Sequence, residues 1–183
     1  MKKSKTGGVL ILDFGSQYTQ LIARRVRENN VYSEILPSNV SLNLILSKNP
    51  KAIILSGGPA SVFSQDAPIF DREILNINIP ILGICYGLQL LVHHSGGTVD
   101  STGEGEYGFA TIKTVTKKGI TKNMTRSSKV WMSHMDQVTI VPDDWEVVAY
   151  SSNNIVAAIA SNDHLRFATQ FHPEVSHTEE GDI

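Results

Sequence analysis

Several features that often point to a function are scarce or missing in this chain of 183 residues. Cys85 is its only cysteine, so no internal disulfide can form, which fits a reducing compartment, and we expect the cytoplasm. No apolar run approaches the roughly 20 residues that span a bilayer, and the N-terminus lacks the apolar stretch of a signal peptide. The formal net charge of -2 provides no basic field. We therefore expect neither a membrane nor a nucleic acid as a partner.

Nucleotide and metal motifs are missing as well. The sequence contains neither a Walker pattern nor a Ser-Gly-Gly-x-Asp-Ser pyrophosphate loop, so it shows no machinery that would activate a substrate with ATP. His93 and His94 are adjacent, and adjacent positions on a helix do not face each other, which makes them a poor start for a metal site. We expect no cofactor and no metal ion in this chain.

The first half of the chain alternates short apolar runs with helical stretches. Runs rich in leucine and β-branched residues predict strands buried on both faces, and their alternation with helices predicts a parallel sheet covered on both sides. The length favours one core, so we expect a single domain over residues 1–183. The expected strands are 9–14, 31–36, 52–56 and 79–84, and the expected helices are about 17–29, 40–48, 68–75 and 86–94.

The second half changes character, because short strands with turn residues between them replace the helices. We interpret these strands as a mixed or antiparallel extension of the same sheet. The expected fold is therefore α/β, with an open, mostly parallel central sheet flanked by helices and extended in the second half. The expected strands are 109–116, 129–132, 137–141, 145–150, 155–160 and 166–171.

Cys85 lies where an apolar strand breaks at glycines directly into a helix. The positive end of the helix dipole favours an anionic sulfur at this junction, and flanking glycines allow the sharp turn of a nucleophile elbow. The other interpretation is a buried structural cysteine that packs as a small hydrophobic residue. This pattern alone does not decide between the two.

Two other predicted strands end in residues that suit thiol chemistry. A Gly-Gly turn at residues 57–58 can direct a backbone N–H outward, although it can equally be an ordinary turn. The last strand runs into His172, and Glu174 shares its face because side chains at i and i+2 of an extended chain point the same way. A nucleophilic cysteine needs such a base, an orienting group and oxyanion donors. A solvent-exposed histidine is the alternative for His172.

These segments resemble the class I (triad) glutamine amidotransferase family, which has a flavodoxin-like fold. Gly83-Ile84-Cys85-Tyr86-Gly87 and Phe171-His172-Pro173-Glu174 carry the resemblance, and the turn at 56–59 lies where the family has its oxyanion loop. Within the family, the chain is most similar to the branch that forms GMP. The motifs that favour this branch are Leu12-Asp13-Phe14-Gly15-Ser16-Gln17-Tyr18, Leu55-Ser56-Gly57-Gly58-Pro59, Glu106-Tyr107-Gly108, Trp131-Met132-Ser133-His134 and His172-Pro173-Glu174-Val175 with His177-Thr178.

The resemblance implies a role for each residue of the predicted catalytic site. Cys85 would be the nucleophile, His172 the general base and acid, and Glu174 the carboxylate that orients His172. The backbone N–H groups of Gly58 and Tyr86 would form the oxyanion hole.

The resemblance also implies residues that hold the amino acid end of glutamine. These would be Gln89, Ser133, His134 and Asp136, with the Asp136 carboxylate pairing with the substrate ammonium group. The family usually has glycine between the histidine and the aspartate, whereas this chain has Met135, so the assignment of Asp136 depends on how that side chain affects the pocket.

The implied reaction is the hydrolysis of glutamine to glutamate and ammonia through a γ-glutamyl thioester on Cys85. Ammonia would pass to an ATP pyrophosphatase module, a synthetase domain or subunit that uses ATP and magnesium to convert XMP to GMP. We expect this chain to be the N-terminal part of such a longer polypeptide; the other option is a short separate subunit. A homodimer formed through a missing C-terminal part stays open.

Two alternative functions remain at this point. The chain could serve anthranilate, aminodeoxychorismate, CTP or carbamoyl phosphate synthesis with the same triad, although residues 13–18 and the His177-Thr178 pair favour the GMP branch. It could also be a non-catalytic flavodoxin-like binding module, which predicts ordinary thiol reactivity at Cys85.

Overall fold

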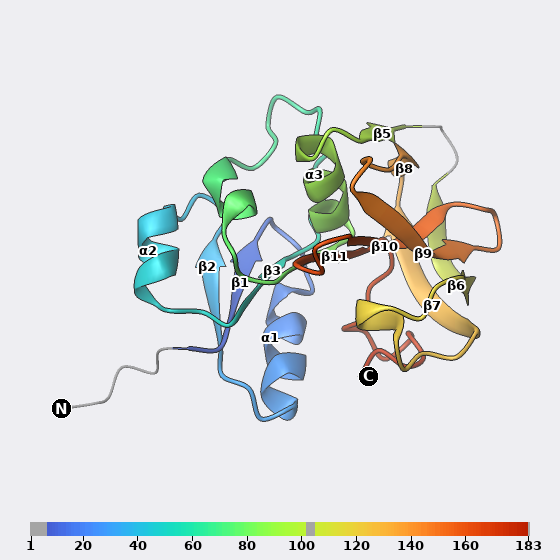
Figure 1. Ribbon diagram of the computed structural model, residues 1–183, viewed down its shortest axis with the longest axis horizontal. Coiled ribbons are helices and arrows are strands. Elements are labelled where there is room, and N and C mark those ends of the chain that lie inside the picture. Colours follow the sequence, from blue (N-terminus) through green and yellow to red (C-terminus); the bar gives the residue numbers. More distant parts are fainter. Residues whose placement is uncertain (1–6, 102–104, 183) are drawn as a thin grey trace.

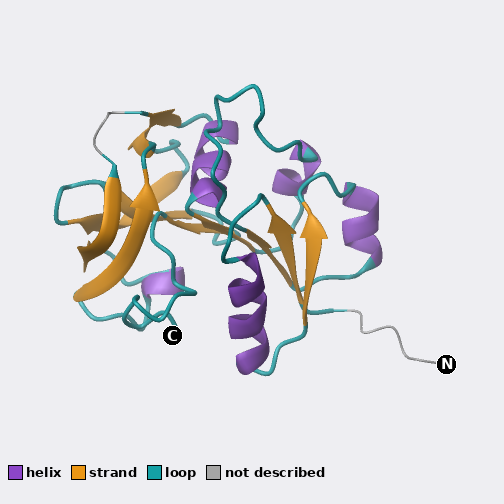
Figure 2. Cartoon of the chain, turned by 180° about the vertical axis from the view of Figure 1, so that it is seen from behind, coloured by secondary structure: helices purple, strands orange, loops and turns teal. Residues whose placement is uncertain are grey.

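A computed structural model describes residues 7–101 and 105–182 (Figure 1). Its main feature is a nine-stranded sheet with the strand order β2-β1-β3-β4-β11-β10-β9-β6-β7. The strands of this sheet are β1 (Val9–Asp13), β2 (Ser33–Pro37), β3 (Ala52–Leu55), β4 (Ile81–Ile84), β6 (Glu106–Thr114), β7 (Ser127–His134), β9 (Trp145–Ser151), β10 (Val156–Ser161) and β11 (Arg166–Thr169). Helices lie on both sides of it (Figure 2).

The first five strands in this spatial order run parallel, as the alternating sequence pattern predicts. Alternate residues of these strands pack on opposite faces. Leu12 on β1 belongs to the core beneath α3 (Tyr86–His94), whereas Ile11 packs with Ile22 of α1 (Thr19–Glu28). Burial on both faces explains why the strands are almost continuously apolar.

The second half forms the mixed extension that the sequence predicts. Strand β10 pairs antiparallel with β11 and β9, and β6 pairs antiparallel with β9 and β7. The prediction that the strand at 137–141 extends the central sheet is wrong. This strand, β8 (Gln137–Ile140), pairs with β5 (Thr98–Asp100) in a separate two-stranded sheet. Val138, the buried residue of β8, packs with Val99 in the core around α3, which draws this strand away from the central sheet.

One predicted helix is also much shorter than expected. Instead of a helix over 68–75, the structure has a 3₁₀ helix, η1 (Arg72–Asn76). It begins after Asp71, whose carboxylate accepts a hydrogen bond from the Glu73 backbone N–H and so fixes the start of the turn. The other short helices are α2 (Leu42–Ser47) and η2 (Gly119–Thr121). No helix within the described ranges has the length and apolar character needed to cross a membrane.

The strands position the candidate site through their shared direction. The parallel strands β1, β3, β4 and β11 end at the same edge of the sheet, and the segments that follow them meet there. Ligands of open α/β sheets bind beyond this edge. Residues that follow these strands in sequence therefore become neighbours in space.

Candidate active site

Cys85 occupies a sharp elbow between β4 and α3. Its backbone has φ 54° and ψ -103°, a conformation that costs free energy for a residue with a side chain. The flanking glycines allow this turn, because a Cβ on Gly83 would lie 2.5 Å from the Gly87 carbonyl oxygen. A Cβ on Gly87 would lie 2.4 Å from the Leu55 carbonyl oxygen. The strand, elbow and helix predicted around Cys85 are therefore present.

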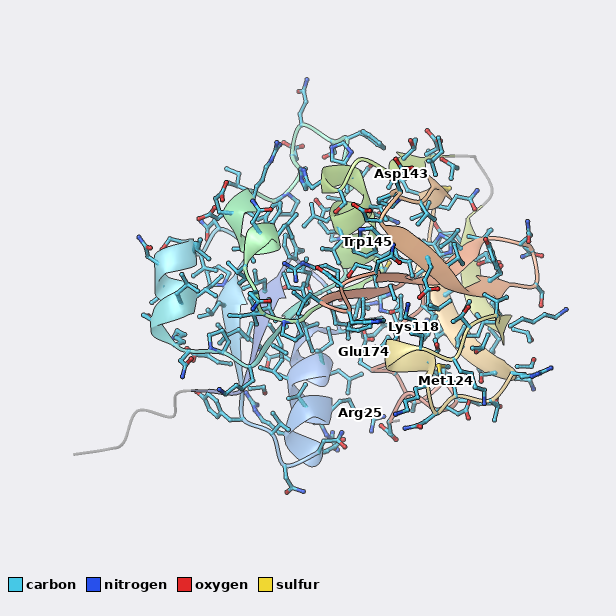
Figure 3. All side chains as sticks on the ribbon, viewed as in Figure 1. Arg25, Lys118, Met124, Asp143, Trp145 and Glu174 are labelled. Carbon is cyan, nitrogen blue, oxygen red and sulfur yellow. The ribbon has the colours of Figure 1, made fainter. Side chains whose placement is uncertain are left out.

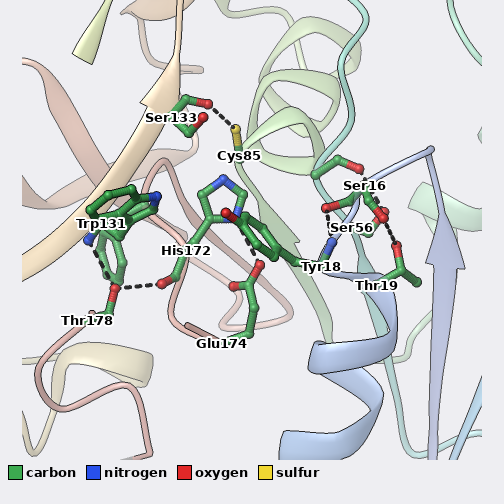
Figure 4. A network of polar contacts seen from close by, with 12 residues as sticks. Ser16, Tyr18, Thr19, Ser56, Cys85, Trp131, Ser133, His172, Glu174 and Thr178 are labelled. Carbon is green, nitrogen blue, oxygen red and sulfur yellow. Dashed lines mark hydrogen bonds and ion pairs between the residues drawn. The ribbon is translucent and has the colours of Figure 1, made fainter. Parts of the chain in front are cut away.

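The Cys85 side chain is nearly buried, and Figure 4 shows its contact with Ser133 close to the imidazole of His172. Its Sγ lies 3.5 Å from the Ser133 carbonyl oxygen, and the Gln170 Nε2 donor lies 3.7 Å from Sγ. Sequence reasoning missed Gln170. The spacing of two residues between His172 and Glu174 could have indicated it, since Gln170 lies two residues before His172, directly after β11 ends at Thr169.

His172 and Glu174 form a buried pair beside Cys85. The His172 Nδ1 lies 2.8 Å from the Glu174 Oε1, and the two side chains are 5% and 2% exposed. Because a carboxylate accepts, Nδ1 donates and Nε2 remains for the sulfur. The Tyr18 ring packs edge-on against the imidazole, with 5.2 Å between centroids. The structure thus brings together the three residues of the predicted triad.

The surroundings of His172 favour its protonated form. Burial disfavours the imidazolium, but hydrogen bonds to Cys85 and Glu174 outweigh burial and raise the pKa of His172 to about 10. At neutral pH both ring nitrogens of His172 are therefore protonated, and the proton on Nε2 lies next to the Cys85 sulfur.

Two contacts fix the backbone that carries this pair. The His172 carbonyl accepts a hydrogen bond of 2.6 Å from the Thr178 hydroxyl. The Glu174 carbonyl accepts one of 2.9 Å from Nε of Arg25, which reaches it from α1 (Figure 3). Thr178 belongs to a sequence motif noted above, whereas no pattern in the sequence indicates the contact of Arg25.

Of the two predicted oxyanion donors, Tyr86 lies at this elbow and Gly58 lies in the loop after β3. Tyr86 is the first residue of α3, where a backbone N–H has no acceptor within the helix. The loop after β3 passes close to the catalytic pair, since a Cβ on Gly57 would lie 3.2 Å from Cε1 of His172. A Cβ on Gly58 would lie 2.5 Å from the Phe14 carbonyl oxygen, so this close approach requires glycine.

One pocket of about 620 Å³ collects most of the predicted site residues. Glu174 and Tyr86 do not line it, because Glu174 lies behind His172 and the Tyr86 side chain is buried in the core. Residues 15–18, which follow β1, form one wall. The predicted residues that line it are Gly58, Cys85, Gln89, Ser133, His134, Asp136 and His172.

The sequence that forms this site matches a known family, because the family model of class-I glutamine amidotransferases matches residues 10–182. The chain belongs to this family. The predicted α/β fold and the identification as a glutamine amidotransferase are both confirmed.

Curated relatives of this amidotransferase place it within the family. It is 52% identical over 177 residues to a GMP synthase [glutamine-hydrolyzing] of Campylobacter lari, which covers 97% of this chain and 35% of the relative. It is 51% identical over 173 residues to that of Brachyspira hyodysenteriae, which covers 94% of this chain and 34% of the relative. The chain thus spans about a third of these relatives and is homologous to their amidotransferase portion.

Solved structures share the fold of this amidotransferase. A Thermoplasma acidophilum protein, assigned as one of the subunits of a GMP synthase, has a TM-score of 0.82 at 28% identity, with 98% of this chain and 90% of that chain covered. A glutamine amidotransferase of Thermotoga maritima has a TM-score of 0.73 at 20% identity, with 94% and 78% covered, and supports the fold alone.

The residues predicted to bind glutamine mainly contact one another in the amidotransferase structure. The Gln89 side chain donates to the Asp136 carbonyl oxygen over 2.9 Å, and the buried His134 ring lies 3.0 Å from the same oxygen. Met135, which lies between His134 and Asp136 in the sequence, also lines the pocket and is 47% exposed. Gln89 and His134 therefore hold the turn that presents Asp136.

Proposed function

We propose that this chain hydrolyses the side-chain amide of glutamine through a thioester on Cys85 and supplies the ammonia that converts XMP to GMP. The observation that carries the proposal is the strained Cys85 elbow with the buried His172 and Glu174 pair beside it, in a pocket that Asp136 also lines. These groups supply the nucleophile, the proton carrier and its orienting carboxylate, and an anion for the substrate ammonium group.

In the first step, the sulfur of Cys85 attacks the amide carbon of glutamine while His172 holds the proton. The carbonyl oxygen becomes negatively charged as the new C–S bond forms. Backbone N–H groups of Gly58 and Tyr86 receive this charge, each contributing about 3 kcal/mol in a site with little water.

In the second step, His172 gives its proton to the departing nitrogen and the C–N bond breaks, which leaves the thioester and free ammonia. The neutral imidazole then takes a proton from a water molecule that attacks the thioester carbon. Glutamate leaves as the C–S bond breaks, and the proton on His172 accompanies the regenerated Cys85. Glu174 keeps Nδ1 protonated and the ring oriented throughout.

The amino acid end of glutamine would lie against the turn at residues 133–136. We assign the ammonium group to the Asp136 carboxylate, with Ser133 and the turn held by Gln89 and His134 completing the subsite. Opposite charges that are partly withdrawn from water give this end of the substrate its orientation.

The destination of the ammonia is part of the proposal. The relatives named GMP synthase are about three times as long as the matched region, which supports a synthetase module as the partner of this chain. We assign ATP and magnesium to that module and no cofactor to this chain. We place the reaction in the cytoplasm, in keeping with the single free cysteine.

The test is glutamate release by this chain alone and with a separately prepared GMP synthetase catalytic module, XMP, ATP and magnesium. We expect release to rise with the loaded module and to vanish in Cys85→Ala. Release that ignores the module would contradict the GMP assignment but keep the glutaminase chemistry. Release that persists in a folded Cys85→Ala protein would overturn the role of Cys85.

A further inference from the structure

Behind the pocket lies a buried carboxylate that the proposed mechanism does not use. Glu106, at the start of β6, is 7% exposed. Its Oε1 accepts hydrogen bonds of 2.8 Å from the Ser151 hydroxyl and from the Asn153 amide. Its Oε2 lies 3.4 Å from Nε2 of His134. Glu106 and His134 are direct partners in the β6 and β7 ladder, so their side chains leave the sheet on the same face.

These contacts continue to the turn that presents Asp136. The Asp136 carbonyl oxygen lies 3.0 Å from Nδ1 of His134 and 2.9 Å from Nε2 of Gln89, so both of its lone pairs have donors. The turn needs such support because it joins β7, the edge of the central sheet, to β8 in the other sheet. Side chains therefore hold a segment that neither ladder continues through.

The hydrogen-bond chemistry couples Glu106 to this turn. Nδ1 of His134 must donate, since a carbonyl oxygen only accepts. In a neutral imidazole Nε2 then has no hydrogen, and it faces a carboxylate oxygen that also accepts. Both contacts hold together only when one proton lies between Nε2 and Oε2. Removing Glu106 would free His134 to rotate and release Asp136.

We infer that Glu106 is a positioning residue: with His134 and the proton between them, it holds Asp136 where its carboxylate can pair with the ammonium group of glutamine. This inference rests on the proposed function and adds a residue to it. Loss of Glu106 should therefore weaken the binding of ligands that carry the amino acid end of glutamine and should leave the reactivity of the Cys85 sulfur unchanged.

The experiment compares two reagents that alkylate Cys85 in the whole chain, followed by intact mass. One is the diazoketone analogue of glutamine, diazo-oxo-norleucine, which has the amino acid end. The other is iodoacetamide, which lacks it. The variants are Glu106→Ala, Glu106→Asp and Glu106→Gln, and the matched control is Glu34→Gln, a carboxylate paired with Lys48 at the opposite edge of the sheet.

We expect Glu106→Ala and Glu106→Asp to raise the half-saturating concentration of the diazoketone about tenfold, the effect of losing one hydrogen bond to a charged group. The iodoacetamide rate should stay within about twofold of wild type. Glu106→Gln should restore diazoketone binding, because its amide can donate to Nε2 of His134 while its oxygen still faces Ser151 and Asn153. Glu34→Gln should change neither rate.

Two results would overturn the inference. In one, the Glu106 variants slow both reagents equally. In the other, diazoketone binding is unchanged in Glu106→Asp, which retains the charge and avoids the cavity of the alanine variant. A failure of the proposed function would give another result. If the diazoketone does not alkylate Cys85 of the wild-type chain even at high concentration, glutamine is not the substrate.

Discussion

Two buried pairs of histidine and glutamate each contribute the histidine to the lining of the pocket, and they behave differently. In one, the partners His172 and Glu174 lie 2.8 Å apart, and the pKa of His172 is raised to about 10. In the other, His134 and Glu106 lie 3.4 Å apart, and burial is the main cause that lowers the pKa of His134, against opposing bonds to Asp136 and Glu106.

The second nitrogen of each ring explains the contrast. In His172 this nitrogen faces the Cys85 sulfur, a group that can become anionic, and a charge there favours the imidazolium. In His134 it faces the carbonyl of Asp136, which is neutral. The same two residue types therefore yield a proton carrier in one place and a structural support in the other.

The largest expected effect comes from removing the sulfur. Cys85→Ala should lower the rate of glutamate release by at least about 10⁴-fold, because no other group in the triad can form the thioester. The same change should lower the pKa of His172, which bonds to Cys85, and should shift the pKa of His134 less, because His134 feels Cys85 only through the charge on His172. Steady-state assays and NMR titration of the histidine rings measure the two effects. A His172 pKa that stays near 10 without the sulfur would contradict the explanation given above.

The next effect separates the members of the catalytic pair. His172→Gln should reduce kcat by roughly 10³-fold to 10⁴-fold, since the proton carrier is lost. Glu174→Gln should reduce kcat by a factor roughly 10-fold to 10²-fold smaller than the loss in His172→Gln, because Glu174 orients the ring without transferring the proton. Circular dichroism of both variants controls for folding. Equal losses in kcat would show that the orienting role assigned to Glu174 is wrong.

A third effect concerns stability and pH. The folded state raises the pKa of His172 from 6.5 to about 10, so this group contributes stability that is complete below pH 6.5 and disappears as the pH rises through about 10. Denaturant unfolding of wild type and His172→Gln should therefore converge at alkaline pH. A constant difference between the two proteins across this range would contradict the raised pKa.

The same contrast shows what the sequence can predict. The pair of His172 and Glu174 was predictable because the two residues are only two positions apart, although β11 ends at Thr169 and a turn at 173–174, not extended chain, brings them together. Glu106 is 28 residues from His134, and only the β6 and β7 register brings them together. Such contacts depend on long-range pairing that no local pattern specifies.

The strands follow the same rule. The parallel strands were predictable because burial on both faces leaves a continuous apolar run, as in β1 and β3. The prediction for β8 was wrong because its one buried residue, Val138, indicates that the strand packs against a core but does not specify its partner strand. The proton relation between Glu106 and His134 likewise needs coordinates, since it follows from the two acceptors that face the ring.

The smallest expected effect concerns Met135, which lies between His134 and Asp136, where the resemblance predicts glycine. Met135 does not have a positive φ, and its side chain is 47% exposed, so the turn does not require glycine at this position. Met135→Gly should lower the free energy of unfolding by about 0.5–1 kcal/mol through the entropy of the unfolded chain. The KM for glutamine should change by less than about threefold, because the side-chain bonds to Asp136 remain. Denaturant unfolding and steady-state kinetics measure both quantities. A tenfold or larger rise in KM, on the order of one lost charged hydrogen bond, would mean that Met135, and not the pair of Glu106 and His134, holds Asp136 in place.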